Sequence, residues 1–158
     1  MKIVYISGSI SDPTTNQPRK GWQKDFLDAE ARLRRMGFQV INPVDIAREV
    51  EDALEWRYYH VGGPCSCNGG PEKPSRADYI MACLQRMQMA HEAGALHGVY
   101  VIGSNAKAMI SDGVRMELHL AHVLNIPIYA EFHGGHRVNT TLIPQVGFDG
   151  IEELLKED

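Results

Sequence analysis

Short runs of apolar residues alternate along this chain with longer segments in which apolar residues recur every three or four positions. The short runs predict buried strands at 2–7, 38–42, 98–103 and 126–130. The longer segments predict helices at 17–36, 43–56, 75–93 and 111–124. Strands that alternate with helices indicate a parallel sheet covered on both faces. We therefore expect an α/β fold, a single-domain Rossmann-like parallel sheet of about four to five strands with helices on both faces.

Capping and turn residues mark where these elements should begin and end. Gly37 stands where a helix C-cap belongs, and Pro43 suits the first position of the second helix. Ser75 and Asp78 have the spacing of a capping box at the start of the third helix. The stretch 60–74 is too rich in glycine and proline for regular structure, so we expect a loop there.

Composition narrows the classes of function. The chain has 158 residues, of which 44% are hydrophobic and 23% are charged, as in ordinary globular domains. Its formal net charge of −4 offers no basic surface to a nucleic-acid backbone, so we expect no polymeric nucleic-acid partner. The first residues run straight into a strand pattern and no segment is apolar enough for a membrane span. With three cysteines, an odd number, we expect reduced thiols and a cytoplasmic location.

The carboxyl ends of the strands are where a parallel sheet binds its ligand. This rule selects the loop after the first strand, the loop after the third strand and the start of the fourth helix. The first of these loops, Ser7 to Ser11, consists mostly of small residues, which allow close approach of backbone to a ligand. Its glycine spacing is not that of a dinucleotide-binding fingerprint.

Glu117 is the strongest candidate for chemistry. At about 100° per residue, Arg115, His119 and His122 share one polar face of the fourth helix. Glu117 falls nearly opposite them, among apolar positions. A carboxylate that faces a core is costly unless it is paired or used, and burial raises its pKa as acid–base and nucleophilic carboxylates require. The alternative is a structural glutamate at the edge of the helix, satisfied by an arginine or by backbone groups.

The start of the same helix favours the chemical interpretation. Ser111 is a natural N-cap, and Gly113 leaves the exposed backbone N–H groups open to an anion. Glu117 lies about 9 Å from Ser111 along the helix axis, close to the span from a 5′-phosphate to the anomeric carbon of a pentose. Plain helix capping is the competing explanation.

These residues resemble the nucleoside 2-deoxyribosyltransferase-like superfamily, including its nucleotide N-glycosidases and a phage-rich branch of uncharacterised members. The resemblance covers most of 1–130 and is most specific in Ser-x-Gly-x-x-x-Glu at 111–117. It also rests on YISGSI at 5–10, VINP at 40–43, IPIY at 126–129 and on Asn16, Phe26, Gly37, Trp56 and Ala121.

The resemblance implies a double displacement at the anomeric carbon of a nucleoside or nucleotide. Glu117 would attack the sugar and release the base, and water or a second base would then free the enzyme. Tyr5 would orient this nucleophile. In the family, a serine at the position of Ser111 accompanies 5′-monophosphate substrates. The 5′ end of the sugar would be held by Gly8, Ser9, Ser111 and Gly113.

The chain departs from the family at the second carboxylate, which usually assists departure of the base. The best alignment places Cys83 where that aspartate would stand, and Asp78 lies five positions earlier. We include Asp78 among the candidate catalytic residues, although its capping-box spacing favours a structural role. Without a second acid, base departure would be weak or the protein would bind without turnover.

We assign 1–132 to a nucleoside deoxyribosyltransferase-like α/β domain and 133–158 to a C-terminal tail with a short helix. In the family this segment often reaches a neighbouring subunit, so the resemblance implies a homo-oligomer, a dimer or larger. His60, Cys65 and Cys67 do not form a tetrahedral zinc set, so we expect no metal, and we expect no cofactor.

Three classes of function remain open. The first is an N-glycosidase or deoxyribosyltransferase that acts on a nucleoside or its 5′-monophosphate, or on another N-glycoside such as NAD. The second is a nucleotide-binding module without catalysis. The third is a structural protein that reuses the fold.

Overall fold

The computed structural model describes residues 1–12, 14–15, 17–63, 65, 69–102 and 111–130. These residues contain a four-stranded parallel sheet in the order β2-β1-β3-β4. The strands are β1 (Ile3–Ser7), β2 (Gln39–Ile41), β3 (Gly98–Val101) and β4 (Ile128–Ala130). The predicted α/β fold is therefore confirmed, with the lower of the two expected strand numbers among the described residues.

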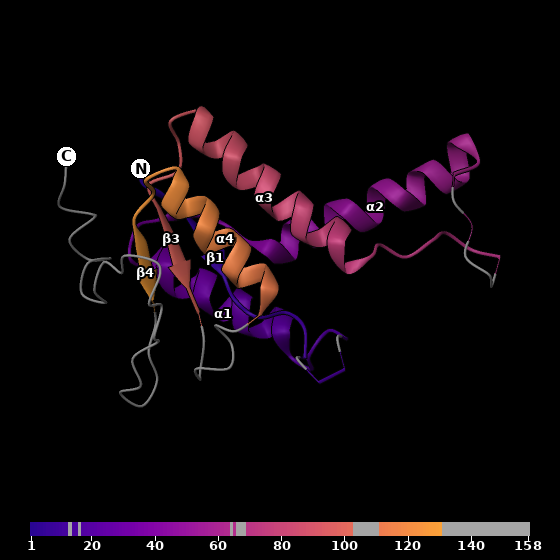
Figure 1. The fold of residues 1–158 in the computed structure, drawn as a ribbon, viewed down its shortest axis with the longest axis horizontal. Coiled ribbons are helices and arrows are strands. Elements are labelled where there is room, and N and C mark those ends of the chain that lie inside the picture. Colours follow the sequence, from indigo (N-terminus) through magenta and orange to yellow (C-terminus); the bar gives the residue numbers. More distant parts are fainter. Residues whose placement is uncertain (13, 16, 64, 66–68, 103–110, 131–158) are drawn as a thin grey trace.

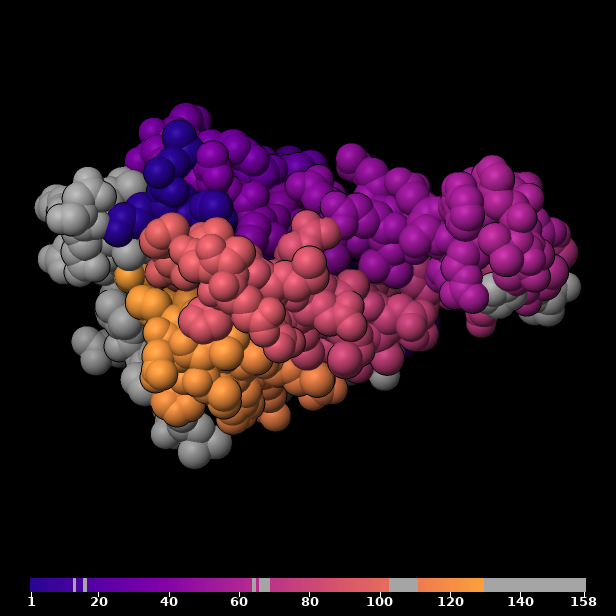
Figure 2. All heavy atoms as spheres, turned by 90° about the horizontal axis from the view of Figure 1, so that it is seen from above, coloured from indigo at the N-terminus to yellow at the C-terminus, as the bar shows by residue number. Residues whose placement is uncertain are grey.

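Helices cover both faces of the sheet (Figure 1). They are α1 (Trp22–Arg35), α2 (Pro43–Val61), α3 (Arg76–Glu92) and α4 (Asp112–Val123). Helix α1 packs on one face, whereas α3 and α4 pack on the other. The start of α2 contributes Val44 and Ala47 to the core cluster on the α1 face and Ile46 to the cluster on the other face. The C-terminal half of α2 extends away from the sheet, as Figure 2 shows from above.

Alternation along β1 divides the core into two clusters. Val4 and Ile6 face α1, whereas Tyr5 points to the opposite face and packs with α3 and α4. All three side chains are fully buried. Because Ser7 follows Tyr5 by two positions, its hydroxyl also lies on the face covered by α4. The carboxyl end of β1 is thus the point where a polar strand residue meets the fourth helix.

Helix α1 begins later than the sequence pattern predicts. The expected start at 17 is wrong because Ser11 pairs with Pro18 in an antiparallel bridge, and the backbone N–H of Arg19 bonds the carbonyl of Ile10. Gly21 then adopts a left-handed conformation before the first helical residue. A backbone that is hydrogen-bonded to the preceding loop cannot also enter the helix.

The end of α1 is as predicted. Gly37 has a φ of +99°, and its N–H bonds the carbonyl of Arg34 at 3.0 Å. The N–H of Phe38 bonds the carbonyl of Leu33 at 3.1 Å, which completes a Schellman motif. This cap directs the chain into β2.

Helix α2 ends at Val61, later than the predicted end near Trp56, so part of the expected loop 60–74 is helical. The rings of Trp56 and His60 stack one helical turn apart, with centroids 4.8 Å apart. Gly62, with a φ of 70°, provides the left-handed C-cap. The glycine and proline content predicted a loop from residue 60, but the helix continues to Val61, just before the first glycine of this stretch.

Helices α3 and α4 have the caps that the sequence predicts. Ser75 and Asp78 form the capping box of α3, and Ser111 accepts a hydrogen bond from the N–H of Val114 at the start of α4. Among the described residues, no helix is both long enough and apolar enough to cross a membrane. The predicted tail at 133–158 lies outside the described residues.

Candidate active site

Glu117 is buried in the face of α4 that packs on the sheet. Only 7% of its surface is exposed, whereas Arg115, His119 and His122 are exposed to solvent. Its neighbours on that face are the core residues Val114, Leu118 and Ala121. The predicted position of Glu117, opposite the polar face, is confirmed.

The carboxyl group of Glu117 lies at the C-terminal end of strand β1. The hydroxyl of Ser7 donates to Oε1 at 3.4 Å, and both side chains are buried. Within the described part of the chain, neither Oε2 of Glu117 nor the Tyr5 hydroxyl has a hydrogen-bond partner. Two buried polar atoms without partners are unusual in a folded protein, because an unsatisfied buried group costs about 1–3 kcal/mol. Such atoms are candidates for contact with a ligand.

The electrostatic environment favours the protonated form of this carboxyl. Burial raises the pKa of Glu117 from 4.5 to about 8. The hydroxyls of Tyr5 and Ser7 oppose this rise in pKa. The Tyr5 hydroxyl acts on the carboxyl although its position does not meet the geometry of a hydrogen bond. Burial also raises the pKa of Tyr5 well above its ordinary value, and the Glu117 charge adds to this effect. Tyr5 therefore keeps its proton at neutral pH.

Cys83 belongs to the same buried cluster. It lies on α3 with 7% of its surface exposed and packs in the core group that contains Tyr5. Burial, assisted by the charge of Glu117, raises the pKa of this thiol to about 12. Cys83, which the sequence resemblance aligns with a second carboxylate, thus lies in the same buried cluster as Glu117 and is a neutral thiol at neutral pH.

The N-terminus of α4 is partly open. Ser111 caps it through its hydroxyl, which accepts from the N–H of Val114 at 3.3 Å. A Cβ placed on Gly113 would come no closer than 3.7 Å to the Ile80 side chain, which is an ordinary contact. Gly113 is therefore not required for packing, and its small size leaves room beside the helix start.

Gly8, in contrast, has a packing reason to be glycine. A Cβ at this position would lie 2.7 Å from Cγ1 of Ile102 and 3.0 Å from Cζ of Phe26. This crowding accounts for the glycine after β1 without any ligand. A contact between the Gly8 backbone and the substrate stays a prediction.

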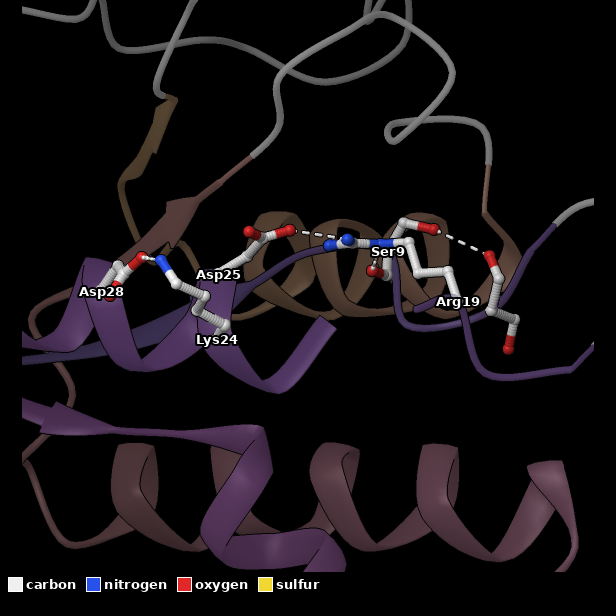
Figure 3. A network of polar contacts seen from close by, with 6 residues as sticks. Ser9, Arg19, Lys24, Asp25 and Asp28 are labelled. Atoms are coloured by element: carbon white, nitrogen blue, oxygen red, sulfur yellow. Dashed lines mark hydrogen bonds and ion pairs between the residues drawn. The ribbon is translucent and has the colours of Figure 1, made fainter. Parts of the chain in front are cut away.

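The loop after β1 is held by Arg19 (Figure 3). Its Nε donates to the carbonyl of Ser9 at 2.7 Å, and its Nη1 pairs with Asp25 at 2.6 Å. Ser9 is buried, and its hydroxyl donates to the carbonyl of Ser11 at 3.1 Å. That hydroxyl keeps its acceptor capacity for a ligand.

Asp78 is at the exposed start of α3. Its carboxylate accepts the backbone N–H of Ser75 at 2.7 Å, which completes the capping box. This bond explains the aspartate structurally, as the sequence spacing predicted. A catalytic role for Asp78 stays a prediction.

The cysteine and histidine cluster is only partly described. His60 contacts the carbonyl of Trp56 through Nδ1, Cys65 is exposed, and Cys67 lies outside the described residues. In the described ranges, no group of three or more potential metal ligands lies close enough to hold an ion.

Two residues at the site were not predicted individually. Ser7 is the hydrogen-bond donor to Glu117, and Arg19 fixes the loop after β1. The two-residue spacing from Tyr5 to Ser7 was a usable signal, because it places both on one face of the strand. For Arg19 the sequence offers no such signal, since its contacts depend on how the loop folds back.

Comparison with known proteins shows the fold. One solved structure, a 2-deoxyribosyltransferase from Bacillus psychrosaccharolyticus, matches with a TM-score of 0.52 and 15% sequence identity. The match covers 95% of this chain and 90% of that one. No family model and no curated protein matches the sequence.

Proposed function

We propose that this protein cleaves the N-glycosidic bond of a nucleoside or nucleoside 5′-monophosphate, as an N-glycosidase or 2-deoxyribosyltransferase. The observation that carries the proposal is the buried Glu117 carboxyl at the carboxyl end of β1, held by Ser7 and close to Tyr5. A burial-raised pKa is common at functional carboxyls. The fold shared with a 2-deoxyribosyltransferase supports the same reaction class.

The reaction proceeds by double displacement with Glu117 as nucleophile. A carboxylate oxygen bonds to C1′ of the sugar, while the bond from C1′ to the base breaks and its electron pair leaves with the base. Water or a second base then attacks C1′ and returns the carboxylate. The transition states resemble an oxocarbenium ion, which a nearby carboxylate stabilises.

The surrounding groups orient the reacting atoms. Ser7 fixes one oxygen of Glu117, which leaves the unpartnered Oε2 to attack. Tyr5, buried and protonated, orients the carboxylate through its hydroxyl once substrate is bound. The 5′ end of the sugar is bound by Gly8, Ser9, Ser111 and Gly113.

A screen for free base tests this proposal. Purified protein is incubated with ribo- and deoxyribonucleosides, their 5′-monophosphates and NAD, and products are separated by chromatography. We expect base release from at least one 5′-monophosphate, lost in Glu117→Gln and kept in Glu55→Gln, a control on the exposed surface of α2. Equal release by the Glu117→Gln variant would remove the proposed mechanism.

A nucleotide-binding module without turnover is the second candidate, and Cys83 favours it. The thiol stands where the family supplies an acid for the leaving base, and its pKa of about 12 makes it a poor proton donor. Nanomolar to micromolar binding of a nucleotide with no product after long incubation would support this module.

We further propose a homo-oligomer, a dimer or larger, in the cytoplasm, with 133–158 at the subunit interface. The family resemblance supports the oligomer and the place of the tail, and the odd number of cysteines supports the cytoplasmic location. Sedimentation of the full chain beside a chain truncated after 132 tests it, because loss of the tail should lower the oligomeric state.

A further inference from the structure

The buried site carries one ionisable carboxyl surrounded by groups that stay neutral. On β1, Tyr5 and Ser7 face Glu117, and on α3, Cys83 does. Neither the phenol nor the thiol ionises at neutral pH, because burial holds both protons in place. Once Glu117 ionises, its charge is therefore without a compensating charge from these three neighbours.

The cation that acts on Cys83 is already engaged. Arg86 on α3 affects the pKa of Cys83, but its guanidinium is paired with Glu49 of α2. Among the described residues, the groups that act on the pKa of Glu117 are the hydroxyls of Tyr5 and Ser7, and no lysine, arginine or histidine is one of them. A buried anion of this kind is stabilised most by a ligand that brings a positive charge.

The acids at the starts of the two helices are also engaged. Asp78 accepts the backbone N–H of Ser75, and Asp112 pairs with Arg76 at 3.4 Å. Both carboxylates are exposed, and each already has a partner on the protein. Neither is arranged in the structure to donate a proton to a departing base.

We propose that the substrate class is an N-glycoside whose leaving group is already a cation, a pyridinium nucleoside 5′-monophosphate such as nicotinamide mononucleotide. This inference rests on the proposed function and names its substrate. The pyridinium ring supplies the positive charge that the Glu117 carboxylate lacks. The ring leaves as a neutral pyridine, so its departure requires no proton donor. This matches a site where Cys83 and Tyr5 keep their protons and are poor donors.

The electron count differs between the two kinds of base. When Glu117 bonds to C1′ of a pyridinium glycoside, the electron pair of the broken bond goes to the ring nitrogen and a neutral pyridine leaves. Water then cleaves the glycosyl ester and one proton is released to solvent. With a purine, the same pair would leave an anion unless another ring nitrogen is protonated. One carboxyl cannot serve as nucleophile and proton donor in the same step.

The test compares nicotinamide mononucleotide with inosine 5′-monophosphate in the full-length protein. Each rate is divided by the uncatalysed rate of the same substrate, so that the greater lability of the pyridinium bond cancels. We expect an enhancement at least about 100-fold larger for the pyridinium substrate, the usual contribution of a general acid. An equal or larger enhancement for the purine nucleotide overturns the inference and leaves the proposed function standing. If neither of these substrates nor any other in the panel releases its base, the proposed function is overturned and the inference with it.

Variants at Cys83 add a second readout. Cys83→Asp introduces a potential proton donor and should move the preference toward inosine 5′-monophosphate by about tenfold or more. Cys83→Ser, which stays neutral, should leave the preference unchanged, and so should Glu55→Gln on the exposed surface of α2. A shift produced equally by the serine and aspartate variants would show that size, and not protonation, sets the preference.

The pH profiles provide an independent check on the charge. The value of kcat/KM should rise with the ionisation of free Glu117, near pH 8. A bound cation stabilises the carboxylate, so the kcat profile for the pyridinium substrate should rise at a pH lower by about one unit or more. Coincident profiles would contradict the charge pairing.

Discussion

Replacement of Glu117 by glutamine should make the protein more stable at alkaline pH, because the folded state disfavours the ionised carboxyl. Burial raises the pKa of Glu117 from 4.5 to about 8. At about 1.4 kcal/mol per pKa unit, full ionisation costs the folded state about 5 kcal/mol. This figure is an upper limit, since solvent that enters the site would reduce it.

The pH range of the effect follows from proton binding in the two states. Below pH 4.5 the carboxyl is protonated in both states and has no effect on stability. Between 4.5 and about 8, the unfolded chain has lost the proton and the folded chain has kept it, so stability falls as pH rises. Above about pH 8 both are ionised and the loss is complete. At pH 7 the loss is about 3 kcal/mol.

Urea unfolding at pH 5, 7 and 9 measures this effect. Glutamine at position 117 never ionises. As pH rises, the difference in unfolding free energy between Glu117→Gln and the original protein should therefore grow in favour of the variant. We expect growth of at most about 4 kcal/mol from pH 5 to pH 9, and no growth for Glu55→Gln on the exposed surface. A difference that stays constant within about 0.5 kcal/mol would refute the burial argument.

Three further predictions concern neighbouring positions. Gly8→Ala places a Cβ 2.7 and 3.0 Å from two core side chains, so urea unfolding should show a loss of about 1–3 kcal/mol, and a neutral result would contradict the packing reason. In Gly113→Ala the new Cβ makes only an ordinary 3.7 Å contact, so the variant should keep its stability. Its affinity for a 5′-monophosphate, measured by calorimetry, should fall about tenfold. Unchanged affinity would argue against an anion site at the start of α4. Cys83, buried with a raised pKa of about 12, should resist iodoacetamide at pH 8 while the exposed Cys65 reacts, as peptide masses will show; equal labelling would mean that the thiol is accessible.

The fold and the position of Glu117 could be predicted because both follow from local periodicity. Apolar runs and helical spacing indicated all four described strands and helices, and the 100° rule placed Glu117 opposite the polar face of α4. The caps at Gly37, Ser75 and Ser111 were readable for the same reason, since a cap depends on a few consecutive residues.

Features that depend on contacts between distant segments could not be predicted. The start of α1 is delayed because the loop before it folds back and Pro18 pairs with Ser11. The bond from Ser7 to Glu117 joins residues 110 positions apart. Such a contact requires β1 and α4 to be docked, which periodicity alone does not specify.

Base release from nucleoside 5′-monophosphates by the original protein and by Glu117→Gln tests whether the buried carboxylate is the nucleophile. We expect release by the original protein and by Glu55→Gln, and none by the folded Glu117→Gln variant. Release at an undiminished rate by Glu117→Gln would contradict the assignment of the buried carboxylate as nucleophile.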